Sequence, residues 1–354
     1  MALLSVAVLN VLVVNAGSTS LKLALVDEDG MALTVASLEQ APAGIDAVGH
    51  RVVHGGDRFR DPVLIDENVL AELEAVSKLA PLHNPPSLKA IEAARHAFPD
   101  RPHVAVFDTA FHATLPEEAA TYPLPARWRQ ELGLRRYGFQ GISVQWAAER
   151  VPVPRLVVCH LGGGSSVTAV RNGHSVDTTM GFTPLEGLPM ATRSGSVDPG
   201  LLLYLLRHGH ASLDELEHAL QYESGLLGLS ELSAHVHELE AAEAVGDERA
   251  RLALAIYARR IAQAVAAAAV AADGLDAIVF TAGAGERSPQ VRARVCAHLG
   301  FLGVELDPVV NEATIGDGEI AAAASSVRVA VIISREDLVI ARAVRQTLAA
   351  ATTD

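Results

Sequence analysis

The chain has 354 residues, half of them hydrophobic, and its 42 acidic residues against 28 lysines and arginines give a formal net charge of −14 at pH 7. Its length predicts two domains with a large core. The negative charge argues against nucleic acid as the main partner, since phosphate backbones are bound by basic surfaces. The two cysteines, Cys159 and Cys296, lack the spacing of a disulfide framework, so we expect a cytoplasmic protein.

The first structured segment reads "VVNAGSTSLKLALVDEDG", residues 13–30, and predicts a strand, a small polar turn and a second strand. The alternative is an export signal. No lysine or arginine precedes Lys22, however, and Asn10 interrupts the apolar run before Asn15 ends it, so the export reading is weak. We also expect no stretch apolar and long enough to cross a membrane, and we interpret the Ala-rich residues 261–273 as the end of a buried helix.

Further strands and helices follow in alternation. Residues 47–56 predict a strand that carries Arg51, residues 66–80 predict a helix with an acidic start, and residues 103–112 predict a strand with Asp108 at its carboxyl end. Ligands of α/β sheets gather outside the carboxyl ends of the strands, so Asp108 is a candidate site residue.

The opening pattern returns half a chain later in "LVVCHLGGGSSVTAVRNGHS", residues 156–175. It returns in part in "AIVFTAGAGERS", residues 277–288, which predicts a strand that enters a glycine-rich loop with an acidic residue. Glycines allow close backbone approach, and successive N–H groups with serine and threonine hydroxyls favour anions. A single turn of this kind would merely connect two strands, but the recurrence predicts phosphate-binding hairpins.

The second half of the chain continues the alternation. Asp198-Pro199 predicts the start of a helix, residues 212–272 predict further helices with acidic, Ala-rich faces, and residues 327–349 predict a strand, a polar turn and a closing helix. Strands that alternate with helices throughout predict an α/β protein with a mixed sheet in each half.

Several longer motifs, taken together and in order from Leu12 to Arg342, resemble the acetokinase family of the actin-like, sugar-kinase-like superfamily. They include "GHRVVHGG", "VAVFDTAFHATLP", "RRYGFQGIS", "TTMGFTPLEGLPMATRSGSVDPG", "VFTAGAGERSPQVRARV" and "EDLVIARA". The resemblance implies two duplicated actin-like, ribonuclease H-like domains around a cleft, here residues 1–109 plus 338–354 and residues 110–337. It also implies a homodimer and a reversible, Mg²⁺-dependent phosphoryl transfer from ATP to a short-chain carboxylate, acetate first, giving acyl phosphate and ADP.

The chemistry of such a transfer explains which residue types it needs. A carboxylate is already ionised at pH 7 and needs no general base, so the difficulty is to bring two anions together and neutralise the charge of the transferred group. Arginine suits this task, and the resemblance assigns it to Arg51 and Arg193, assisted by His160. Ion pairs with Asp46 or Asp198 are the structural alternatives for these arginines.

The resemblance extends to further residues of the site. Asp108 and Glu336 match the acidic residues that order the nucleophile side and hold Mg²⁺, with Asn15 nearby. The acyl pocket would be formed by Val53, Leu82, His83, Phe139 and Pro184, although core packing would explain the apolar members, and an architectural role His83, equally well. The nucleotide and its phosphates would contact Ser18, Ser20, Lys22, Gly162, Gly163, Gly164, His235, Val236, His237, Gly283, Ala284, Gly285 and Glu286.

The sequence departs from the family pattern at several of these positions. Gln140 stands where the family has a phosphoryl-contacting histidine, so it is expected to be a weaker, uncharged donor. The other departures are Val144 for histidine, Gly163 for asparagine, Ser196 for aspartate, His235 and His237 in a segment that usually carries Asp and Arg, Arg287 for asparagine, and a shortened span between Ala36 and Asp46. These changes leave open a different acid, a different phosphoryl donor, or a nucleotide-binding protein that has lost catalysis.

Overall fold

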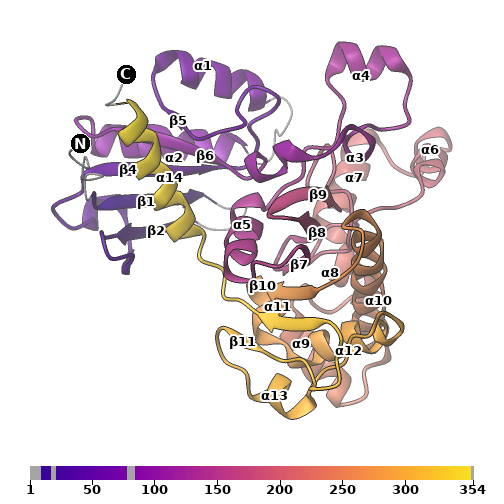
Figure 1. Cartoon of the computed structure of the whole chain (residues 1–354). Helices are drawn as coiled ribbons and strands as arrows, with labels where there is room; N and C mark the ends of the chain where they lie inside the picture. The colour runs from indigo at the N-terminus through magenta and orange to yellow at the C-terminus, as the bar shows by residue number, and fades with distance from the viewer. Residues whose placement is uncertain (1–8, 17–20, 78–83, 352–354) are drawn as a thin grey trace. The chain divides into compact units, whose positions relative to one another are not determined.

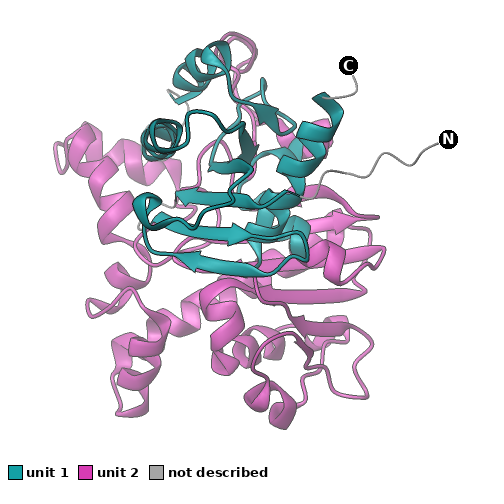
Figure 2. Cartoon of the chain, turned by 90° about the vertical axis from the view of Figure 1, so that its left-hand side faces the viewer, with its two compact units in different colours: residues 1–113, 139–146, 335–354 teal, residues 114–138, 147–334 magenta. Residues whose placement is uncertain are grey.

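The computed structural model describes residues 9–16, 21–77 and 84–351. The chain forms two compact units, residues 1–113, 139–146 and 335–354 in the first and residues 114–138 and 147–334 in the second (Figure 2). The domain boundaries expected from the sequence stay a prediction.

The first unit contains a six-stranded mixed sheet with the order β3-β2-β1-β4-β6-β5. Strands β1, β4 and β6 are parallel, whereas β2, β3 and β5 pair antiparallel with their neighbours. The strands are β1 (Val11–Ala16), β2 (Leu21–Val26), β3 (Ala32–Val35), β4 (Ala47–Val52), β5 (Val63–Leu64) and β6 (His103–Phe107).

Helices cover both faces of this sheet, as the alternation of side chains along β1 requires. Val11 and Val13 pack with the residues of α14 (Glu336–Ala351), whereas Leu12 and Val14 pack with those of α2 (Asn84–Ala97). Figure 1 shows α14, in yellow, lying along these strands. Helix α1 (Glu67–Val76) begins where predicted, with the Asp66 carboxylate accepting from Val69 N as its cap.

The sheet of the second unit repeats the same topology, in the order β11-β12-β10-β7-β8-β9. An antiparallel hairpin again leads to two parallel strands and an antiparallel edge strand, so β7 and β8 correspond to β1 and β2. This repetition confirms the fold expected from the recurrent hairpin. The strands are β7 (Arg155–Leu161), β8 (Ser165–Arg171), β9 (His174–Thr178), β10 (Ala277–Thr281), β11 (Gly318–Glu319) and β12 (Arg328–Val331).

Helix α10 (Glu248–Ala271) provides much of the core of the second unit, through Leu254, Ile261 and Val265 among others. The expectation that no segment could cross a membrane was wrong by length and composition alone, because α10 meets both criteria in the described part of the chain. Half of its most apolar window is buried within the protein, and its inner face packs on the sheet, as expected of the core helix of a globular domain.

Ten further α-helices of four to ten residues lie in the described chain. They are α3 (Glu117–Ala120), α4 (Ala126–Leu132), α5 (Gly141–Arg150), α6 (Pro199–Arg207), α7 (Leu213–His218), α8 (Gly225–Ser230), α9 (Val236–Ala244), α11 (Ala282–Arg287), α12 (Pro289–Ala297) and α13 (Pro308–Ala313). The predicted helix start at Asp198-Pro199 is confirmed, because the Asp198 carboxylate accepts from Gly200 N and Pro199 is the first residue of α6. The "GAGER" segment differs from its prediction as a loop, since it forms the helix α11.

Gly49 on β4 is expected to be intolerant of any side chain. A Cβ there would lie 2.7 Å from Val344 Cγ2 and 2.8 Å from Ile340 Cγ2, both on α14. We predict that Gly49→Ala lowers the free energy of unfolding by about 1–3 kcal/mol through overpacking, measured by urea denaturation. Gly300→Ala is the control, since a Cβ at Gly300 meets no atom within 4 Å. Equal stability of the two variants would contradict the packing of α14 described above.

Candidate active site

An ion pair between Arg51 and Asp108 forms the centre of the site in the first unit. Arg51 lies on β4 and Asp108 directly follows β6, the next parallel strand of the sheet. Arg51 Nε donates to Asp108 Oδ1 at 2.9 Å and Nη2 to Oδ2 at 2.5 Å. The Asp108 side chain is 1% exposed and that of Arg51 15%. The carboxylate therefore fixes one edge of the guanidinium in a bidentate geometry.

Asn15 and Glu336 extend this pair on the other side of the guanidinium. Arg51 Nη1 donates to Asn15 Oδ1 at 3.1 Å, and Asn15 Nδ2 donates to Glu336 Oε2 at 2.7 Å. Asn15 lies on β1, beside β4, and Glu336 is the first residue of α14. The topology thus brings together four residues that the sequence placed up to 321 positions apart.

The electrostatics of the cluster keep Arg51 charged. Burial alone would lower the pKa of Arg51, but the carboxylates of Asp108 and Glu336 outweigh burial and raise it. Burial raises the pKa of Asp108, and Glu336 adds to that rise, whereas Arg51 opposes it. The Asp108 carboxylate therefore depends on Arg51 for its charge. The alternative partner Asp46 accepts instead from Asn10 N.

The turn at Gln140 packs directly on Asp108. Gln140 is buried, its backbone is in the left-handed region with φ of 61°, and its N–H stabilises the Asp108 carboxylate. Gly141 N donates to Asp108 O at 2.9 Å, and a Cβ at Gly141 would lie only 2.3 Å from that oxygen. This close approach requires glycine after Gln140. The neighbouring Phe139 is buried, and its carbonyl accepts from His112 Nε2 at 2.9 Å.

Further hydrogen bonds between side chains and the backbone fix the segment that follows β4. Asn84 Oδ1 accepts from His54 N at 3.0 Å, Asn84 Nδ2 donates to His54 O at 2.9 Å, and Gly55 N donates to Thr109 Oγ1 at 3.1 Å. These bonds hold the turn beside the buried Val53. Lys22 lies on β2, opposite Asn15 in the ladder, and is exposed. Ser18, Ser20, Leu82 and His83 lie outside the described residues.

Two glycine-rich segments lie side by side in the second unit. The turn of Gly162, Gly163 and Gly164 follows β7, and a Cβ at Gly162 would lie 3.6 Å from the Cβ of Ala282, the first residue of α11. A Cβ at Gly283 would lie 3.7 Å from Gly162 Cα. His160 lies at the carboxyl end of β7, between Ser166 on β8 and Thr281 on β10.

The segment that carries Arg193 contacts the first of these turns. Ala191 N donates to Gly163 O at 3.3 Å, and Met190 N donates to Arg193 O at 3.0 Å. Burial lowers the pKa of Arg193, so its charge is partly desolvated. The structure thus brings His160, the glycine turns and Arg193 together through their backbones, and Pro184, three residues before this segment begins at Gly187, is buried.

His235 and His237 are exposed at the start of α9, with ring centroids 5.9 Å apart. Within residues 9–16, 21–77 and 84–351, no three His, Cys, Asp or Glu side chains are grouped to hold a metal. Val236 lies between them, and α9 is tied to the segment after α11 by a hydrogen bond from Ser288 Oγ to Glu240. The exposed histidines are therefore placed as surface groups of the helix.

Sequence reasoning missed how α11 is held at its two ends. Glu286 Oε1 accepts from Ala282 N and from Ser334 N, both at 2.8 Å, so its carboxylate is bound to the chain's own backbone. Arg292, which is 1% exposed, donates through Nη1 to Gly285 O at 3.0 Å and to Glu286 O at 2.9 Å. Its other donors bind Asn311. Arg292 falls on the same side of a predicted helix as Val291 and Val295, and this apolar face was the sequence feature that could have indicated its burial.

The comparisons with known proteins came from a family model, curated sequences and solved structures. The model described as "Acetokinase family" matches residues 31–342. Proteins named acetate kinase from Nostoc punctiforme and Geobacillus kaustophilus are 49% and 47% identical over 306 residues each, covering 84% of this chain and 75% and 77% of theirs.

Two solved structures are also similar. The acetate kinase of Porphyromonas gingivalis aligns with a TM-score of 0.85 at 34% identity, covering 96% of this chain and 99% of that one. A propionate kinase from Francisella tularensis aligns with a TM-score of 0.87 at 35% identity, covering 94% and 98%.

The buried Arg292 is expected to be essential for the position of α11. Arg292→Met keeps an apolar stem but leaves four acceptor atoms of Gly285, Glu286 and Asn311 without the donors that satisfy them. We predict a loss of about 3 kcal/mol or more in the free energy of unfolding, measured by urea denaturation. Arg287→Met, at an exposed position of α11, is the matched control and should change stability by less than about 0.5 kcal/mol. Similar losses of stability in both variants would contradict the role of Arg292 in holding α11 in position.

The buried histidines of the first unit predict a loss of stability in acid. Burial lowers the pKa of His112 and of His54 to about 4 each, below the ordinary value of about 6.5. The unfolded chain therefore takes up protons first as the pH falls, and stability decreases between pH 6.5 and 4. We predict a loss of about 2 kcal/mol per histidine between pH 7 and 5, measured by urea denaturation at each pH.

His112→Gln keeps an N–H donor for Phe139 O and should reduce this pH dependence. His96→Gln, at an exposed position of α2, should leave it unchanged. A pH profile of His112→Gln that matches the wild-type profile would contradict the assignment.

Proposed function

The chain belongs to the acetokinase family, and from that premise we propose that it transfers the γ-phosphoryl group of ATP reversibly to a short-chain carboxylate, acetate first, giving acyl phosphate and ADP. The observation that carries the proposal is the hydrogen-bonded cluster in which Arg51, Asp108 and Asn15, at the carboxyl ends of parallel strands, meet Glu336 at the start of α14; Asp108 is buried and the other three are half-buried. Its geometry fits a site that must hold a transferring phosphoryl group without a general base.

Arg51 is the residue we assign to the phosphoryl group and its acceptor in the first unit. Asp108 binds Nε and Nη2, which fixes the plane of the guanidinium, and Asn15 fixes Nη1. A preorganised cation of this kind stabilises charge that develops in the transition state without the cost of reorganising at that moment. Val53 and Phe139, both buried in the same unit, would contact the methyl group of the acid, as would Leu82 and His83.

The second unit would bind the nucleotide and its phosphates. The glycine turn 162–164 and the start of α11 present closely spaced backbone groups, which suits an anion that must approach the main chain. His160 and Arg193 would add donors to the phosphoryl group, and Pro184 would line the acyl pocket. Glu286 is a positioning residue in this proposal, since its carboxylate is bound to Ala282 N and Ser334 N. His235, Val236 and His237 would contact the adenine side.

The proposed metal is Mg²⁺, which supplies charge neutralisation for the phosphates when bound. Oxygen donors, one or two of them carboxylates, suit this ion, and most of its other ligands are substrate phosphates and water. Asp108 has both oxygens engaged by Arg51, so Glu336 is the better candidate for direct contact. Asn15 would join it by exchanging the bond that its Oδ1 accepts from Arg51 Nη1 for the ion. The donor set of the first unit therefore fits Mg²⁺, with Asp108 acting through Arg51.

A homodimer in the cytoplasm completes the proposal. None of the nine residues of α6, all of them described, is buried, and Leu201, Leu203 and Tyr204 are 49–59% exposed. Such an apolar helix favours burial against a second copy of the chain. Cys159 and Cys296 are both free and buried, which fits a reducing compartment.

Acyl hydroxamate formation tests the function directly. Purified protein with Mg-ATP, hydroxylamine and acetate, propionate or butyrate should give hydroxamate, fastest with acetate, and EDTA should stop the reaction. Product from another acid alone would identify that acid as the substrate. ATP binding by calorimetry without product from any acid would overturn the kinase and leave a nucleotide-binding protein.

Gln140→His in the same assay tests the weaker donor at that turn. A protonated imidazole makes a charge-assisted bond that the amide cannot, worth about 1–3 kcal/mol, so we predict an increase in kcat of about tenfold or more. Gln140→Asn keeps a neutral amide in the same left-handed turn and should not raise kcat. A Gln140→His variant slower than wild type would contradict the assigned role.

A further inference from the structure

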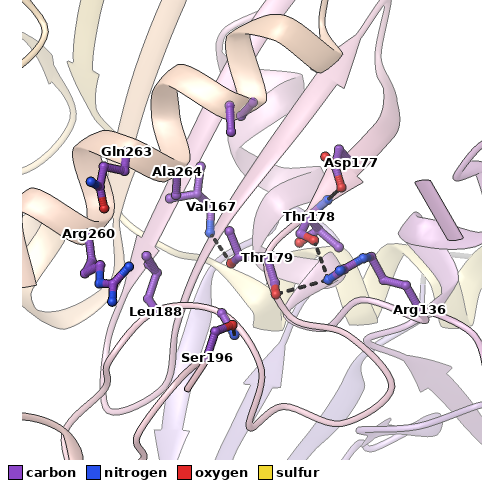
Figure 3. A pocket seen from close by; sticks show the side chains of 13 residues that line it. Arg136, Val167, Asp177, Thr178, Thr179, Leu188, Ser196, Arg260, Gln263 and Ala264 are labelled. Carbon is purple, nitrogen blue, oxygen red and sulfur yellow. Dashed lines mark hydrogen bonds between the residues drawn. The ribbon is translucent and has the colours of Figure 1, made fainter. Parts of the chain in front are cut away.

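A cavity of about 350 Å³ lies wholly within the second unit and outside the residues assigned to catalysis. It is bounded by β8 and β9, by one side of α10, and by the residues that open and close the segment 187–196 (Figure 3). The lining that the argument uses consists of Arg136, Asp177, Leu188, Ser196, Arg260 and Gln263. Its volume falls within the range of small-molecule sites.

One end of the cavity offers an uncommitted cation. Arg260 lies on α10, and its side chain makes no hydrogen bond or ion pair with any residue that the structure describes. Gln263, three positions later, lines the same side of the cavity and adds an amide donor. A guanidinium and an amide on one helix face together suit a carboxylate.

The opposite end offers an acceptor rather than a second free cation. Arg136 is already engaged, since it donates to Thr178 O at 3.0 Å and Thr179 O at 3.1 Å and pairs with Glu186 at 2.9 Å. Asp177 lies beside these residues, on the far side of the cavity from Arg260 in Figure 3. One of its oxygens accepts from Thr178 N. Burial raises the pKa of its carboxyl, and the Thr178 N–H and the charge of Arg136 oppose that rise without cancelling it.

Apolar side chains separate the two polar ends. Val167 and Leu188 are buried and line the cavity together with Ala264 of α10. A ligand that satisfies all three regions is a carboxylate with a short apolar chain and a positively charged group at its far end. We propose that this cavity binds a small ω-amino carboxylate, with the carboxylate on Arg260 and Gln263 and the ammonium group on Asp177.

The cavity is built onto the segment that carries Arg193. Gly187 N donates to Ser196 Oγ at 3.0 Å, and Ser196 N donates to Gly187 O at 2.9 Å, so the two ends of this segment are joined at the cavity wall. A ligand in contact with Ser196 therefore stabilises one arrangement of the segment. This coupling rests on the proposed function, which assigns Arg193 to the phosphoryl group; the binding site itself does not depend on it.

Calorimetric titration of the full chain with 4-aminobutyrate tests the site, with butyrate and butylamine as probes that each lack one charged end. We expect saturable binding of 4-aminobutyrate, weaker by about tenfold or more in Arg260→Gln and in Asp177→Asn. Arg259→Gln, at the adjacent exposed arginine outside the cavity, should bind as wild type does. Absence of saturable binding, or equal loss in the Arg259 variant, would overturn the proposal.

Kinetics of hydroxamate formation test whether binding in this cavity affects the segment that carries Arg193, independently of whether the cavity binds the ligand. With 4-aminobutyrate saturating, KM for acetate should change by about threefold or more in wild type and remain constant in Arg260→Gln. A constant KM in wild type overturns the coupling. A chain that binds 4-aminobutyrate but forms no hydroxamate contradicts the proposed acyl kinase and leaves the site supported.

Discussion

The ion pair between Arg51 and Asp108 is the interaction on which the first unit's site depends. It joins β4 to the end of β6, and Asn15 hydrogen-bonds both Arg51 and Glu336, which links the pair to α14. Asp108 and Asn15 occupy two sides of the Arg51 guanidinium. An anion can therefore bind only to the exposed part of this side chain, which is 15% exposed. The Gln140 N–H stabilises the Asp108 carboxylate and Gly141 N donates to Asp108 O, so a shift of this ion pair would also displace the turn that carries Gln140.

Duplication of the sheet explains why both units have polar groups at equivalent places. In each sheet an antiparallel hairpin leads into two parallel strands, so the carboxyl ends of those strands meet at one edge. The first unit has placed charged side chains at that edge, and the second has placed glycine turns and a short helix there. The two edges therefore present different chemistry, a fixed cation in the first unit and closely approachable backbone in the second.

Periodicity and turn chemistry were sufficient to predict the strand pairs of the two hairpins, the strand before Asp108 and the helix start at Asp198. They failed where long-range contacts decide the local structure. The "GAGER" segment has glycines typical of a loop, but its helix is held by the Glu286 carboxylate from within and by Arg292 from α12. The pairing of Asn84 with the His54 backbone likewise joins residues 30 positions apart, and neither short segment contains a sign of the other.

The polar cluster of the first unit is hard to explain by stability alone. A buried ion pair gains little over apolar residues of similar volume, because desolvation offsets most of the attraction between the charges. In a protein that only needed to fold, the charges of Arg51, Asp108 and Glu336 would therefore add a desolvation cost without a matching gain in stability. Asn15, placed between a guanidinium and a carboxylate, satisfies both with one amide and leaves their charges in place. That arrangement makes sense where an anion must be bound and its charge balanced, and this requirement belongs to phosphoryl transfer more than to a passive nucleotide-binding role.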